Sequence, residues 1–181
     1  MDSTGKAQDS NYGERAYLYV RGKPFRALVR FDLSRIPDKS TIVSASFGLY
    51  KWYGIGCSGR TYAAHRVTSS WTEMGVTWKK RDGVNYWESW GGDVSREDAA
   101  SVALPDGEGW VRWDVKAMVQ GWVSGSHENH GLLIKDKNED GDVNRYSVFW
   151  SREYTGDPSL QPRLVVEYMT TSSAHGEKGW E

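Results

Sequence analysis

Apolar and polar residues alternate along many short stretches of this chain, a pattern with a period of two residues that is typical of strands with one buried face. In the stretch Phe25–Asp32, the apolar side chains of Ala27 and Val29 alternate with the charged side chains of Arg26 and Arg30. Glycine and other turn-forming residues separate such stretches. Strands are predicted at residues 16–20, 25–32, 41–52, 60–67, 101–104, 110–115, 131–135, 145–151 and 163–168, with two shorter aromatic segments around Trp71 and at 76–78.

One short helix is predicted directly after the strand 110–115. Asp114 is of a residue type that favours the helix N-cap, and apolar residues follow it at helical spacing before Gly125. These apolar residues are Val115, Met118, Val119 and Trp122. Between Lys79 and Glu108 the strand pattern is lost except at 101–104, so we expect a long ordered loop there.

About ten short strands with regular turn signals and one connecting helix favour the all-β class. Within that class they favour an antiparallel β-sandwich, a jelly roll of two packed sheets. The sandwich domain is predicted to cover residues 1–168, and the small, polar residues 169–181 are predicted to form a tail or linker.

The charge balance lowers the expectation of a nucleic-acid partner. The 181 residues include 23 Lys and Arg against 24 Asp and Glu, whereas a chain that binds phosphates normally has a basic excess. No run of apolar residues is long enough to cross a membrane, so membrane insertion is not expected. Cys57 is the single cysteine, which excludes an internal disulfide.

The aromatic composition points to surfaces as well as to the core. The chain has 10 Trp and 10 Tyr but only 4 Phe, so most of its aromatic rings carry a polar group that suits half-exposed positions. Such rings fill cores, and they also stack on sugars.

The strand pattern places arginines on the outer face of a sheet, opposite the apolar positions. Guanidinium groups suit carboxylates, and flat rings suit the C–H face of a sugar. The alternative interpretation is that these arginines form ordinary surface ion pairs with acidic residues such as Asp32, Glu153 and Glu167 and bind no ligand. The predicted ligand-binding residues are Arg26, Arg30, Arg66 and Lys135 for carboxylates, and Tyr50, Trp52 and Tyr62 for stacking.

Two loop motifs allow alternative interpretations. Gly54–Gly59 matches the G-x-G-x-x-G dinucleotide fingerprint, but a strand is predicted after it instead of the required helix, which favours a hairpin loop. The segment 136–144 begins like a calcium loop, although Ser147 stands where an EF-hand has glutamate, so it is either a solvated hairpin loop or a Ca²⁺ site. The predicted calcium ligands are Asp136, Asn138, Asp140 and Asp142.

No constellation of catalytic residues is recognisable in the sequence, because the carboxylates are scattered and the four histidines lack metal-binding spacing. We therefore predict a chain without catalytic activity. A lyase or hydrolase site assembled from distant loops is the weaker alternative.

Several phrases occur in an order that resembles the DNRLRE domain, also classed as carbohydrate-binding module family 96. The resemblance extends from Gln8 to Tyr168. The phrases that carry it are Asn11–Gly13, Arg26–Leu33 with Ile36 and Pro37, Ile42–Tyr50, Val67–Glu73 with Val76–Trp78, Trp113–Val115 with Val119–Trp122, Asn129–Lys135, Ser151–Glu153 and Pro162–Tyr168.

The resemblance implies a secreted or cell-surface β-sandwich module of the kind appended to polysaccharide-degrading enzymes or to large surface proteins. Some members of that family are linked to alginate binding. We therefore expect a non-catalytic module that binds an acidic, uronate-containing polysaccharide such as alginate. The alternative is a structural or assembly module of an extracellular surface protein, adhesin or fibre, in contact with neighbouring domains or copies.

Overall fold

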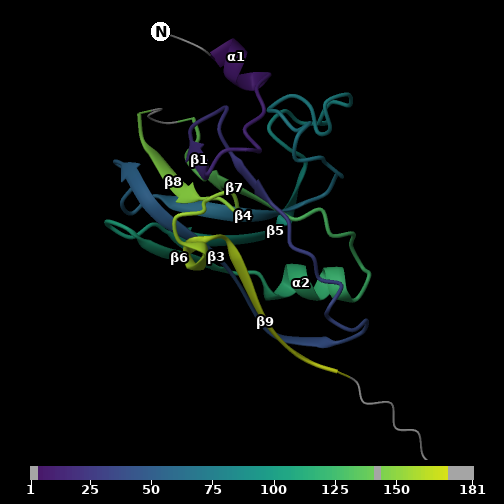
Figure 1. The fold of residues 1–181 in the computed structure, drawn as a ribbon. Helices are drawn as coiled ribbons and strands as arrows, with labels where there is room; N and C mark the ends of the chain where they lie inside the picture. The colour runs from purple at the N-terminus through teal and green to yellow at the C-terminus, as the bar shows by residue number, and fades with distance from the viewer. Residues whose placement is uncertain (1–3, 141–143, 171–181) are drawn as a thin grey trace, which may run out of the picture.

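The protein is a sandwich of two antiparallel sheets, as the alternating pattern predicts (Figure 1). The structure is a computed structural model that describes residues 4–140 and 144–170. Sheet A has the order β1 (Tyr17–Arg21), β8 (Tyr146–Trp150), β3 (Thr41–Ile55), β6 (Gly109–Asp114), and β9 (Arg163–Met169) also pairs with β3. Sheet B has the order β2 (Ala27–Val29), β7 (Leu132–Asp136), β4 (Thr61–Val67), β5 (Val94–Ala103). The predicted all-β sandwich is confirmed.

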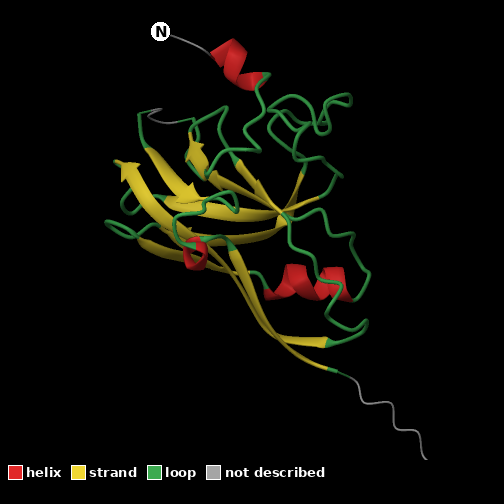
Figure 2. Cartoon of the chain, in the orientation of Figure 1, coloured by secondary structure: helices red, strands yellow, loops and turns green. Residues whose placement is uncertain are grey.

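Helices are few and short, and they lie at the periphery of the strands (Figure 2). They are α1 (Thr4–Gln8), α2 (Lys116–Val123) and the 3-10 helix η1 (Pro158–Leu160). The helix predicted after Asp114 is α2, but its N-cap residue is Val115 and not, as the sequence suggested, Asp114. Asp114 lies one residue earlier, where its Oδ1 atom accepts a hydrogen bond from the backbone N–H of Lys116 at 3.0 Å. The sequence pattern did not predict α1.

The long strand β3 organises sheet A. It pairs with β6 through Ser46–Lys51, with β9 through Thr41–Gly48 and with β8 through Lys51–Ile55. Because these stretches overlap, β6 must lie on one side of β3, whereas β8 and β9 share the other side. A bulge between Lys51 and Tyr53 shifts the register next to β8. In Figure 1, β9 and the start of β3 run together away from the body of the sandwich.

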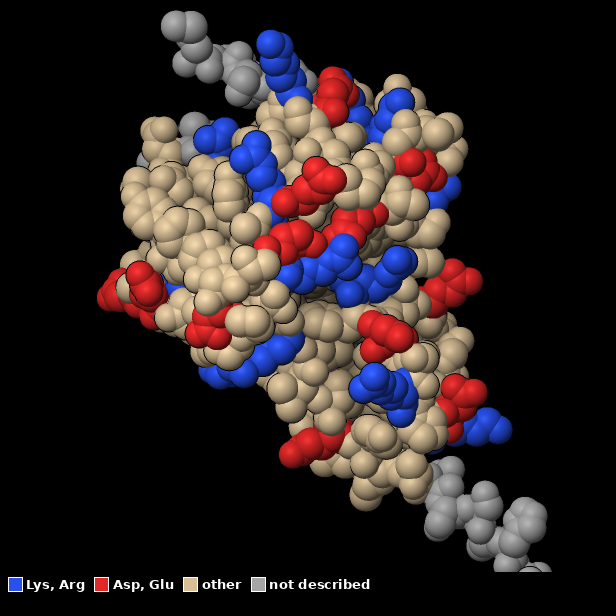
Figure 3. Space-filling view, in the orientation of Figure 1, with Lys and Arg blue, Asp and Glu red and all other residues tan. Residues whose placement is uncertain are grey.

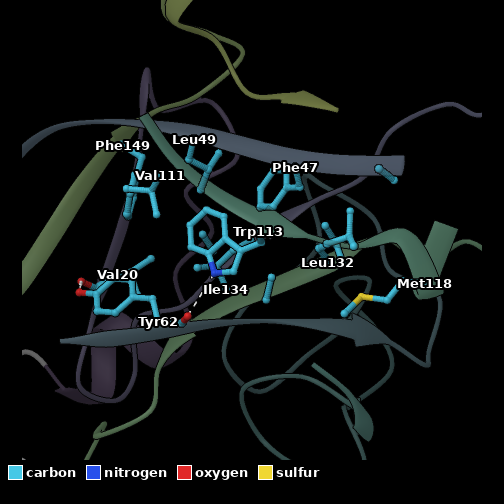
Figure 4. Packing of buried hydrophobic residues seen from close by; sticks show 14 of the residues in the cluster. Val20, Phe47, Leu49, Tyr62, Val111, Trp113, Met118, Leu132, Ile134 and Phe149 are labelled. Atoms are coloured by element: carbon cyan, nitrogen blue, oxygen red, sulfur yellow. Dashed lines mark hydrogen bonds between the residues drawn. The ribbon is translucent and has the colours of Figure 1, made fainter. Parts of the chain in front are cut away.

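The core between the sheets contains large rings that also make hydrogen bonds (Figure 4). The indole N–H of Trp113 donates to the carbonyl of Tyr62 at 3.1 Å, and the Tyr62 hydroxyl donates to the carbonyl of Val20 at 3.1 Å. Both rings are fully enclosed, and Phe47 stacks on Trp113 with the ring centroids 5.3 Å apart. Since buried polar groups need partners, these bonds allow the two rings to fill the centre of the sandwich.

A second apolar cluster lies on the outer face of sheet B. The loop between β4 and β5, residues 68–93, which we call the covering loop, brings Trp71 and Trp87 against Val67 and Leu133. The side chains of Val67 and Leu133 leave the sheet on the side opposite the main core. The Trp87 indole N–H donates to the carbonyl of Thr77 at 3.0 Å. The outer face of sheet B is therefore covered around Val67 and Leu133, whereas residues of β5 such as Ala99 and Ser101 remain exposed.

Some predicted boundaries in this region were wrong. The segments around Trp71 and at 76–78 belong to the covering loop and not to strands. The predicted long loop 79–108 contains the strand β5, of which only residues 101–104 were expected. Among the described strands β5 pairs only with β4, at the edge of sheet B, so its segment Ser95–Asp98 does not need alternating apolar residues.

We expect Trp87→Ala to lower the free energy of unfolding by about 3–5 kcal/mol, because it empties the centre of the outer cluster. Trp90→Ala is the matched control: it lies in the same loop, but its side chain is 56% exposed. Chemical denaturation monitored by circular dichroism measures both. Equal, small losses would show that the outer cluster contributes little to stability.

Candidate functional site

Arg26, a predicted ligand-binding residue, forms a buried ion pair within the protein. Its guanidinium donates to the two carboxylate oxygens of Glu139 at 2.6 and 2.7 Å and to the carbonyl of Gly91 at 2.9 Å. It also lies over the ring of Trp78, 4.7 Å from the centroid. The side chains of Arg26 and Glu139 are only 11% and 7% exposed, so this arginine joins two loops to sheet B and is not free to meet a ligand.

Lys135, another predicted ligand-binding residue, lies beside this pair on the outer face of sheet B. Burial and the positive charge of Arg26 lower the pKa of Lys135. Lys135 is therefore a half-buried member of the same structural cluster.

Arg66 does not join Arg26 and Arg30, contrary to the prediction. It pairs in register with Leu132, a core residue, so its side chain leaves sheet B on the core-facing side. There its Nε donates to Asp98 at 2.7 Å, and this bond lowers the pKa of Asp98.

The three predicted stacking rings are not on one surface either. Tyr62 is completely buried in the core, where burial raises its pKa, so the prediction that it stacks on a ligand was wrong. Tyr50 and Trp52 lie on sheet A, where Tyr50 contacts Trp110 edge to face and Trp52 stacks on Trp150. The arginines of sheet B and these two rings therefore belong to different sheets.

The carboxylates of the predicted calcium loop contact cations of the protein itself. Asp136 is buried and accepts from Arg60 at 2.5 Å, and Asp140 accepts from Lys23 at 2.9 Å, which lowers the pKa of Asp140. The backbone N–H of Asn138 donates to Asp136 at 2.9 Å. Asp142 lies outside the described residues. Within residues 4–140 and 144–170, no group of three or more acidic, histidine or cysteine side chains is placed to hold a metal, and calcium binding stays a prediction.

A cleft of about 940 Å³ lies where the edge strands β1 and β2 of the two sheets meet. Its base includes apolar side chains such as Leu18, Val29 and Phe31. Three segments form its walls: the chain before and between β1 and β2, the covering loop, and the turn after β8. The aromatic residues that line it are Tyr12, Tyr17, Tyr19, Phe25, Trp71, Trp78 and Trp87.

Local hydrogen bonds explain why the N-terminal segment lies along this cleft. The side-chain amide of Asn11 donates to the carbonyls of Glu73 and Val76, each at 2.6 Å, and its oxygen accepts from the N–H of Gly13 at 2.9 Å. These bonds attach the segment to the covering loop and place Tyr12 at the wall of the cleft.

The charged residues of the cleft differ in how they are paired. Arg30 is exposed and lies over the ring of Trp71, 5.5 Å from the centroid, and it makes no ion pair with any residue that the structure describes. Arg15 lies over Tyr12 and likewise has no ion pair among those residues. Arg152 donates to Glu73 at 2.5 Å and to Glu153 at 2.6 Å, and these carboxylates raise its pKa.

Of the predicted site residues, Arg26 and Arg30 line this cleft, and only Arg30 is free of a salt bridge in the described chain. Sequence reasoning did not select Arg15, Arg152 or Tyr12. Their positions fall in or beside the phrases Asn11–Gly13 and Ser151–Glu153, which carry the family resemblance, and that was the signal available. Figure 3 shows basic and acidic side chains next to one another across the centre of one face, which agrees with the extensive pairing.

We expect Glu139→Ala to lower the free energy of unfolding by about 3–5 kcal/mol, because it leaves Arg26 buried without its counterion. The double change Arg26→Met with Glu139→Leu should cost less than Glu139→Ala alone. Lys23→Ala is the control, since it breaks an exposed ion pair to the same loop and should have little effect on the free energy of unfolding. Urea denaturation measures all three, and a small effect of Glu139→Ala would contradict the structural role of Arg26.

Comparisons with known proteins agree with the fold and the phrase order. A search of curated proteins finds no match for this chain. No helix among the described residues is long and apolar enough to cross a membrane. The family model of carbohydrate-binding module family 96 matches residues 3–168, nearly the whole chain. The chain therefore belongs to carbohydrate-binding module family 96.

Proposed function

We propose that the chain is a non-catalytic module that binds an acidic, uronate-containing polysaccharide such as alginate in the cleft between β1 and β2. The observation that carries the proposal is the exposed guanidinium of Arg30 above the Trp71 ring, with no carboxylate of the described chain paired to it. An unpaired guanidinium can donate hydrogen bonds to a ligand carboxylate without first losing a protein partner.

The remaining lining supports the same chemistry. Arg15 at the Tyr12 wall offers a second cation next to an aromatic ring, so a sugar could stack while its carboxylate meets a guanidinium. Glu73 and Glu153 hold Arg152 from two sides and leave carboxylate oxygens near the rim that can accept bonds from sugar hydroxyls.

An extracellular setting is part of the proposal. Such polysaccharides lie outside cells, and the family resemblance implies a secreted or cell-surface protein. The module would hold neighbouring domains of a larger protein close to the polymer.

We expect Arg30→Gln to weaken alginate binding roughly tenfold, because a charge-assisted hydrogen bond is lost. Isothermal titration at low and at high sodium chloride should show a steep salt dependence for the unchanged protein and a shallower one for the variant. Arg96→Gln is the matched control, because Arg96 is an exposed arginine on β5 that does not line the cleft. Unchanged alginate affinity in Arg30→Gln, or tighter binding to a neutral glucan than to alginate, would contradict the proposal.

An assembly function is the second candidate, favoured by the open edge of β9. This strand pairs only with β3 among the described strands, and Val165 on it is 56% exposed. An antiparallel pairing of two copies centred on Val165 would set Arg163 opposite Glu167 of the second copy, twice by symmetry. Opposite charges in such positions stabilise a pair of strands, and open edges are templates for pairing.

If β9 pairs with a second copy, sedimentation at increasing protein concentration should reveal a dimer. Val165→Lys should abolish that dimer, because two lysines would face each other at its centre. Val84→Lys, at a position that is 76% exposed in the covering loop, should leave it intact. A protein that stays monomeric at every concentration would exclude this assembly.

A further inference from the structure

A continuous series of aromatic rings crosses the outer face of sheet A, and we call it the ring track. Each ring contacts the next, with centroids 3.7 to 6.1 Å apart. In order, the ring track consists of Tyr154, Trp150, Trp52, Tyr53, Tyr146, Tyr19, Phe25 and Tyr12.

The strand register explains why these rings share one face. Tyr19 and Tyr53 both lie opposite Val148, from the two sides of β8. Side chains opposite each other across a ladder point to the same side of a sheet. Leu18 and Phe149 alternate with them and pack in the core, so the rings point outward.

Part of the ring track is a rigid base and part is exposed. Trp52, Trp150 and Tyr154 stack nearly parallel, with interplanar angles of 4° and 6° between successive rings, so each ring covers a face of its neighbour. Tyr53 next to this stack is 46% exposed, and Tyr17, opposite Trp150 in register, is 37% exposed. Within the ring track, Tyr53 and Tyr12, which is 45% exposed, therefore face solvent, and Tyr17 lies beside it on the same face of sheet A.

The ring track is continuous with the cleft. Tyr12, Tyr19 and Phe25 at its end line the cleft, and so does Tyr17. From there it crosses β1, β8 and β3, which are neighbouring strands of sheet A. Two strand spacings amount to about 10 Å, which is longer than a single sugar residue.

The charges of the ring track differ from those of the cleft. The guanidinium of Arg21 lies over Phe25 and Tyr19, 4.6 and 5.9 Å from the ring centroids. On β3, in the middle of the ring track, the exposed neighbours Tyr53 and Ile55 are uncharged. A contact there depends on apolar area and ring geometry, and it is little affected by salt.

We propose that the ring track is a second contact surface for the same polysaccharide, and that sugar residues extending beyond the cleft pass Tyr17 and place their C–H faces on Tyr53. This inference rests on the proposed function, since the polymer is taken to enter the cleft at Arg30. Recognition then has two parts. The cleft binds the carboxylates of the polysaccharide, and the ring track adds affinity for longer polysaccharides.

The test compares a short alginate oligomer that fills the cleft with alginate polymer, by titration at low and high sodium chloride. Tyr53→Ala should weaken polymer binding about 3- to 10-fold, and the loss should persist at high salt. Binding of the short oligomer should change less than about twofold, a difference within the error usual for independent sites. Tyr168→Ala is the matched control, because Tyr168 is 40% exposed but lies on β9 away from the ring track.

A second variant separates stacking from simple loss of bulk. Tyr53→Leu keeps an apolar side chain but has no flat ring, and it should lose most of the polymer affinity that Tyr53→Ala loses. If both variants bind the polymer as tightly as the unchanged protein does, the proposed role of the ring track is wrong, even if Arg30→Gln still weakens binding of the short oligomer. If Arg30→Gln has no effect on either ligand, the proposed function fails instead. Loss of self-association in Tyr53→Ala, with polymer binding unchanged, would assign the ring track to a second copy and overturn the proposal.

Discussion

The contact between the covering loop and the outer face of sheet B determines which charged side chains can meet a ligand. Trp71 and Trp87 lie on Leu133 and Val67, so this face is removed from water. Charges at its border must then be compensated within the protein, because an uncompensated buried charge is costly. Arg26 satisfies this requirement with Glu139 and the carbonyl of Gly91, and the same contacts hold two loops in place.

The location of the cleft follows from the same constraint. The covering loop closes sheet B around Leu133, and the cleft lies beside it, where the edge strands β1 and β2 meet. Arg30 follows the last paired residue of β2, Val29, and is therefore beyond the covered sheet. Its guanidinium rests on the rim of the covering loop, at Trp71, and stays exposed.

The aromatic residues serve two physical purposes in two layers. Trp113 and Tyr62 fill the core and satisfy their polar atoms on backbone carbonyls. The rings of the ring track lie on the opposite face of sheet A, where Tyr53 and Tyr17 remain partly exposed. An excess of Trp and Tyr over Phe suits both positions, because each ring combines apolar area with one polar group.

Local patterns in the sequence were sufficient for the fold class, the short helix after Asp114 and most strands, since each depends on residues close together in the chain. They also predicted that Arg26 and Arg30 lie opposite the core positions. They could not assign Tyr62 or Arg66 to a face, because the strand Thr61–Val67 has apolar residues at both parities. Nor could they show that a loop covers sheet B or that Glu139 reaches Arg26. Alternation separates the two faces of a strand, whereas the element that packs against each face is decided only when distant segments meet in the tertiary structure.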